Sequence, residues 1–116
     1  MNLEGLVDEF AENIAAQTDR ILQGDAKTGN KHARRALSAF KKLRAHGDIG
    51  RDALLTLFSH PRMDVRVTAA AFLLRHRTEE AKKVLEEAAK GKGLAALGAM
   101  QTLKNWDAGT WALDPE

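Results

Sequence analysis

Residues 54–74 read LLTLFSHPRMDVRVTAAAFLL, two apolar segments joined by a short polar turn. In each segment the apolar residues recur at the spacing of an amphipathic helix. Pro61 cannot continue a helix, and helical geometry is also disfavoured for the residue before a proline. The stretch therefore predicts a helix, a turn at Ser59-His60-Pro61 and a second helix over about 63–76.

The same helical spacing extends in both directions from this stretch. The predicted helices cover about 2–23, 31–45, 49–58, 63–76, 79–90 and 94–106. Asn30, Asp48 and Thr78 precede three of them and are good candidates for N-caps, because their side chains can accept from free backbone N–H groups. Residues 107–116 read as a C-terminal tail after a single domain at 1–106.

Composition agrees with an all-α fold. Among 116 residues there are 20 alanines and 15 leucines, but only 7 valines and isoleucines together and no tyrosine. Alanine and leucine favour helices, whereas strands favour β-branched and aromatic residues. Cysteine is absent, which excludes a disulfide scaffold and a cysteine nucleophile. No apolar run approaches the roughly 20 residues of a membrane span, so a cytoplasmic protein is expected.

An internal repeat relates the second, fourth and sixth predicted helices. Aligning them by Ala39, Ala70 and Ala99 places small or β-branched residues one turn earlier and leucines one turn later. The aligned sets are Ala36, Val67 and Ala96, and Leu43, Leu74 and Leu103. A shared period of about 30 residues is typical of stacked helical hairpins. We therefore expect an α-α superhelix of about three hairpins.

Two resemblances follow from these motifs. The turn and second helix in 54–74, with Pro61, Asp64 and Arg66 followed by Ala69-Ala70, resemble a HEAT-type repeat. More widely, GNKHARRAL around Asn30, the SHPRMDVR turn and TLKNWDAG around Trp106 resemble a small bacterial family of unknown function with HEAT-like helices. The resemblance covers about residues 3–109 and implies a fold but no activity. Some small helical families of this kind are suspected immunity proteins that bind toxins.

Charge is unevenly distributed along the chain. Residues 1–25 hold six acids and one base, whereas residues 26–47 hold seven bases and no acid, although the net charge is only +2. At 100° per residue, five cations of the second helix share an arc of about 120°. They are Lys31, Arg34, Arg35, Lys41 and Lys42. If second helices line a concave surface, as in HEAT-type stacks, this arc predicts a binding surface for an acidic protein.

Other interpretations of this arc stay open. It could be a solvated face neutralised by the acidic first helix, in the same molecule or in a second copy, which would give a monomer or a weak homodimer. It could also bind nucleic acid, although no aromatic residue interleaves the cations for base stacking.

The remaining candidates point to structure rather than chemistry. The four histidines lack the spacing of a metal site, no acid–base pair is evident, and no cofactor motif occurs, so we expect neither metal, cofactor nor catalysis. His60 is expected to satisfy backbone groups of the turn. Arg66 is expected to bridge to a neighbouring turn, or else to bind an anion. Trp106 is expected in the core, and Trp111 either folds back or contacts a partner.

Overall fold

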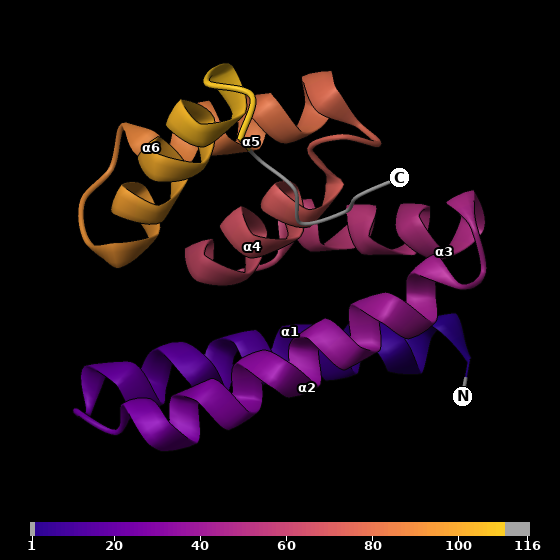
Figure 1. Cartoon of the computed structure of the whole chain (residues 1–116), viewed down its shortest axis with the longest axis horizontal. Coiled ribbons are helices and arrows are strands. Elements are labelled where there is room, and N and C mark those ends of the chain that lie inside the picture. The colour runs from indigo at the N-terminus through magenta and orange to yellow at the C-terminus, as the bar shows by residue number, and fades with distance from the viewer. Residues whose placement is uncertain (1, 111–116) are drawn as a thin grey trace. The chain divides into compact units, whose positions relative to one another are not determined.

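The computed structural model describes residues 2–110, and over these residues the chain contains only helices (Figure 1). The helices are α1 (Leu3–Leu22), α2 (Ala26–Arg44), α3 (Asp48–Ala53), the 3-10 helix η1 (Leu54–Ser59), α4 (Met63–Leu73), α5 (Thr78–Ala89) and α6 (Leu94–Asp107). The predicted all-α fold is confirmed. The chain divides into two compact units, residues 1–57 and 58–116, and each is described by itself.

In the first unit α1 and α2 form a long helical hairpin, and α3 packs against both. Phe10 of α1 and Phe40 of α2 are fully buried and are the largest side chains of its core. Gly50 allows α3 to approach α2 closely, because a Cβ at this position would overlap the carbonyl oxygen of Leu43. This unit is therefore held by two helices with complementary apolar stripes and a short third helix against them.

In the second unit α4, α5 and α6 each contact the other two. The core is a cluster of small and branched aliphatic side chains: Val67, Ala70, Leu74, Ala81, Leu85, Ala88 and Ala99. Because alanines make up four of these seven residues, the helix axes can approach closely. Trp106 is half-buried and packs against this cluster from α6.

The helix starts differ from the sequence prediction at three places. Asn30 lies inside α2, and Asp25 is the N-cap instead, so the prediction of an Asn30 cap is wrong. Gly47 and Arg77 are the N-cap residues of α3 and α5, and Asp48 and Thr78 are the first residues of those helices. At Gly47 the backbone φ is +72°, a conformation that glycine adopts without strain.

The predicted third helix over 49–58 is an α-helix only as far as Ala53 and continues as η1. Such 3-10 turns are common where an α-helix ends, and here the chain must leave helical geometry before Pro61.

The positions aligned by the internal repeat have nearly the same environment. Eight of the nine are buried, and the ninth, Leu103, is partly buried against the core of the second unit. The 30-residue register therefore marks the apolar stripes of α2, α4 and α6.

Candidate functional site

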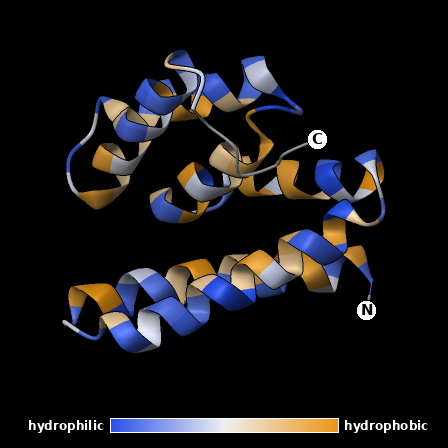
Figure 2. Cartoon of the chain, viewed as in Figure 1, coloured by the Kyte–Doolittle hydropathy of each residue, from blue (hydrophilic) through white to orange (hydrophobic). Residues whose placement is uncertain are grey.

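The cations predicted as a binding surface lie on the solvent side of α2. Lys31, Arg34, Arg35, Lys41 and Lys42 are all exposed. Ala36, Ala39, Phe40 and Leu43, on the opposite side of the helix, are buried. Figure 2 shows the hydrophilic colouring along the outer side of α2. The structure thus brings the five cations together on one helical surface, as their spacing predicts.

A sixth cation, Lys27, belongs to the same surface. Because α2 begins at Ala26 rather than near residue 31, Lys27 is helical and exposed, four residues before Lys31 and seven before Arg34. We call Lys27 and the five predicted cations the basic face. The sequence signal for this earlier start is Asp25. It stands three residues before Thr28, which is the spacing between an N-cap side chain and the backbone N–H that it accepts from.

Asp25 starts the helix that carries the basic face. One of its carboxylate oxygens accepts from the backbone N–H of Thr28 at 3.1 Å. This hydrogen bond, with a further one to the Thr28 side chain and the positive charges of Arg20 and Lys31, lowers the pKa of Asp25 below its ordinary value. The carboxylate therefore stays ionised at the positive end of the helix dipole, where a negative charge is favourable.

The other helix of the hairpin carries the opposite charge. Glu4, Asp8, Glu12 and Asp19 of α1 are exposed and lie within an arc of about 80° at 100° per residue. We call these four residues the acidic face. It lies away from the buried stripe of α1, which includes Leu6, Phe10 and Ile14. The first unit therefore presents two helices whose solvent sides have opposite charge.

Two close contacts set how α2 sits on α1. His32 Nδ1 lies 2.9 Å from Asn13 Oδ1. Gly29 is buried inside α2, where a Cβ would lie 3.1 Å from Ile21 Cγ1 and 3.4 Å from the carbonyl oxygen of Gln17. Gly29 therefore belongs to the interface between the helices, and not to a segment before the helix as an N-cap at Asn30 would require. These contacts orient the basic face away from α1.

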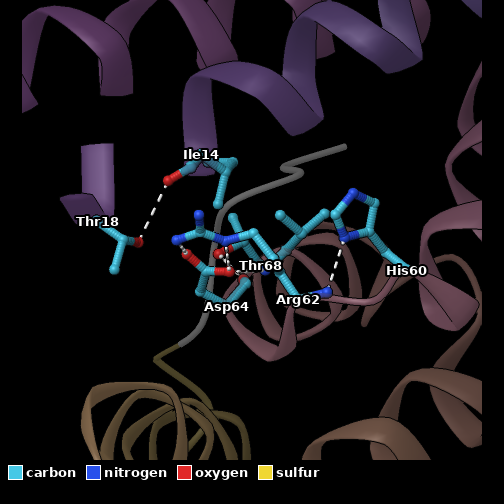
Figure 3. A network of polar contacts seen from close by, with 7 residues as sticks. Ile14, Thr18, His60, Arg62, Asp64 and Thr68 are labelled. Atoms are coloured by element: carbon cyan, nitrogen blue, oxygen red, sulfur yellow. Dashed lines mark hydrogen bonds and ion pairs between the residues drawn. The ribbon is translucent and has the colours of Figure 1, made fainter. Parts of the chain in front are cut away.

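The turn at His60-Pro61 forms its own polar network in the second unit (Figure 3). His60 Nδ1 accepts from the backbone N–H of Arg62 at 3.0 Å. Arg62 donates from Nε and Nη2 to the two oxygens of Asp64, both at 3.0 Å. Asp64 also accepts from the backbone N–H of Val65 at 2.9 Å, and the Thr68 hydroxyl donates to the Asp64 carbonyl oxygen at 2.8 Å. The sequence interpretation missed Arg62, which makes the bidentate ion pair.

Arg66 contacts its own turn within the second unit. Its Nη2 donates to the carbonyl oxygen of Pro61 at 3.3 Å, five residues earlier. Its Nε is buried and has no hydrogen-bond partner in the described part of the chain.

Three further expectations concern a metal site, a membrane-spanning helix and Trp111. Within residues 2–110 no group of three or more histidine and acidic side chains is placed to hold a metal ion. No helix of the described chain is both long enough and apolar enough to cross a membrane. Trp111 lies outside the described residues.

The fold and the charged faces define a class of protein, an all-α chain whose first helical hairpin has acidic and basic sides. Within that class, the chain belongs to the family described as a domain of unknown function, DUF2019, which matches residues 4–107. It is also similar to the crystal structure of protein RPA1889 from Rhodopseudomonas palustris CGA009, at 30% identity and a TM-score of 0.91. That similarity covers 100% of this chain and 95% of the other. No curated protein matches the chain.

Proposed function

We propose that this protein is a non-catalytic binding module whose basic face receives an acidic protein surface. The observation that carries the proposal is the arrangement of six exposed cations on one side of α2, without an acidic residue between Ala26 and Arg44. Such a surface attracts an acidic partner at long range and orients it before contact. A toxin-binding or adaptor role in the cytoplasm fits this chemistry.

The proposal includes a repeat architecture. The shared burial of the aligned positions in α2, α4 and α6 supports HEAT-like hairpins, in which second helices line one surface.

A protein partner is favoured over nucleic acid because the basic face contains no aromatic side chain on which a base could stack. Phe40, the aromatic residue of α2, is fully buried.

The experiment is an affinity capture from lysate of the native host, split into nuclease-treated and untreated halves and read by mass spectrometry. The bait is the wild-type chain beside a variant with Lys31→Glu, Arg34→Glu and Lys41→Glu. A matched control carries Lys82→Glu, Lys90→Glu and Lys92→Glu, three charge reversals in α5 and the segment that follows it. A defined acidic protein that resists nuclease, is retained by the control and is lost by the α2 variant would support the proposal.

Binding of the purified pair is then measured as a function of salt. We expect affinity to fall as salt rises, with a shallower dependence in each single-charge variant of the basic face. A partner that binds the α2 variant as well as the wild type would show that the basic face is only solvated surface. Capture that disappears with nuclease would favour the nucleic-acid alternative. Charge-driven self-association would appear in light scattering as a dimer that dissociates at high salt.

A further inference from the structure

A hollow of about 410 Å³ opens on the second unit, between the start of α4, with Phe58 of η1, and the helix α5. Its size falls in the range of about 300–1,000 Å³ that small organic ligands occupy. Six residues line it: Phe58, Met63, Arg66, Lys83, Val84 and Glu87. The hollow shares no residue with the basic face, because all six residues belong to the second unit.

One wall of the hollow is apolar. Phe58, Met63 and Val84 are partly buried and pack against the core cluster of the second unit. Their exposed parts line the hollow. Since the buried cluster supports this wall from behind, an apolar group placed on it would lose contact with water without requiring the core to rearrange.

The other lining residues carry charge. Arg66 has one hydrogen bond, from Nη2 to the Pro61 carbonyl oxygen at 3.3 Å, and its Nε is buried without a partner in the described chain. A guanidinium has five N–H donors, and a buried donor without an acceptor is unfavourable. An anion in the hollow would offer this guanidinium charge-assisted hydrogen bonds.

Lys83 and Glu87 set the charge that the hollow accepts. Both are exposed, and they stand four residues apart on α5, so they lie on the same side of the helix. With Arg66 and Lys83 the lining has two positive charges, and Glu87 adds one negative charge. The remaining net charge favours a monoanion over a dianion such as phosphate.

We infer that this hollow binds a monocarboxylate that carries an apolar group of moderate size. The carboxylate lies between Arg66 and Lys83, and the apolar group lies on Phe58, Met63 and Val84. Two sources share this chemistry, a free organic acid and the C-terminal carboxylate of a peptide that ends in an apolar residue. The inference does not depend on the proposed role of the basic face.

The test is an NMR titration of the full ¹⁵N-labelled chain with 4-phenylbutyrate and with its uncharged analogue 4-phenylbutyramide. We expect saturable shifts of backbone amides near Met63–Arg66 and Lys83–Glu87 with the carboxylate. We expect about tenfold weaker binding of the amide, because hydrogen bonds to a charged group contribute more than neutral ones. Equal affinity for the two compounds, or saturable shifts elsewhere only, would overturn the inference.

Variants separate the site from a general effect of charge. Arg66→Gln and Lys83→Gln should each weaken binding of 4-phenylbutyrate about tenfold or more, because each removes a charged donor. Lys83 is exposed, so its variant keeps the test valid if Arg66→Gln disturbs the turn. Lys90→Gln, an equal charge change at the end of α5, should bind as the wild type does. Wild-type affinity in both Arg66→Gln and Lys83→Gln would contradict the assignment.

A second titration, with peptides, distinguishes a free organic acid from a peptide C-terminus as the source of the carboxylate. The tripeptide Gly-Gly-Phe is compared with its C-terminal amide in the same titration. Tighter binding of the free-acid tripeptide than of 4-phenylbutyrate identifies a peptide C-terminus, and the reverse order identifies a small organic acid. Both orders support the shared carboxylate chemistry, whereas failure of both carboxylates to bind would refute it.

Discussion

His32 in α2 and Asn13 in α1 join the two helices of the hairpin through a 2.9 Å contact between Nδ1 and Oδ1. Asn13 Nδ2 donates to the carbonyl oxygen of Glu9 at 2.8 Å, so Asn13 Oδ1 faces the imidazole as an acceptor. His32 Nδ1 therefore carries the hydrogen and donates it. Together with the close approach of Gly29 to α1, this side-chain bond sets the register of α2 and the direction of the basic face.

Replacing Asn13 with alanine should destabilise the protein by about 1–2 kcal/mol, because the half-buried imidazole N–H loses its acceptor. Urea unfolding measures the change. In a double-mutant cycle with His32→Ala we expect a coupling energy of about 1 kcal/mol. The control is Gln101→Ala, which removes an exposed hydrogen bond to Asn105 and should cost less than about 0.5 kcal/mol. Additive effects of the two hairpin variants would argue against the bond.

Gly50 and Gly98 make a matched pair of Gly→Ala substitutions with opposite expected signs. At Gly50 the new methyl group would overlap the backbone of Leu43, so we expect a loss of about 3 kcal/mol or more. At Gly98, inside α6, no atom lies close to the added Cβ, so the variant should be more stable by about 0.5–1 kcal/mol. Denaturant unfolding of both variants checks the signs. A neutral Gly50→Ala would mean that α3 does not approach α2 as closely as described.

Asp25 should make part of the stability depend on pH. Its pKa is lower in the folded chain than in the unfolded chain, so folding favours the ionised form. Its contribution is therefore complete above the ordinary carboxyl pKa of about 4, and it is lost as the pH falls through the lowered value.

The variant Asp25→Asn keeps a capping acceptor but cannot ionise. We expect the wild type to have the higher melting temperature at pH 7, and the difference between the two proteins to shrink as the pH falls below about 4. Circular dichroism at both pH values measures it. A difference that does not change with pH would show that the charge of Asp25 is not involved.

The ion pair between Arg62 and Asp64 should contribute more than an ordinary surface pair, because both oxygens of Asp64 accept from one planar guanidinium. We expect Arg62→Met to destabilise the protein by about 1 kcal/mol. Arg62→Lys should recover less than half of this, since an ammonium cannot make the paired contact. Thermal unfolding compares them with Lys90→Met at the exposed end of α5. Full recovery by lysine would indicate that charge alone matters.

The helices themselves could be predicted from sequence because each has a continuous apolar stripe, and the stripe is a property of the helix as a whole. Phe10, Phe40 and Leu85 are buried where the spacing places them. Helix starts are less predictable, because several residues near a start have side chains that can act as an N-cap, each for a different first turn. Asn30 and Asp25 both have suitable side chains, and Asp25 caps α2 because Gly29 is needed inside the helix against α1.

Five of the six cations of the basic face could be predicted from the sequence, and the sixth could not. Five cations follow from spacing within a helix that starts near residue 31, whereas Lys27 requires the true start at Ala26. The hollow beside α5 could not be predicted from the sequence, for a different reason. Its apolar wall combines Phe58 and Met63 with Val84, which follows them by 26 and 21 positions and meets them only through the packing of α4 and α5.

The opposite charges of the acidic and basic faces make the first unit an electric dipole, to which the net charge of +2 is a poor guide. Such a molecule turns in the field of an approaching charged surface before it touches it. It should therefore be retained near neutral pH by cation-exchange and anion-exchange resins alike, each holding it by a different helix. The hairpin thus determines which side of the protein a charged surface meets first.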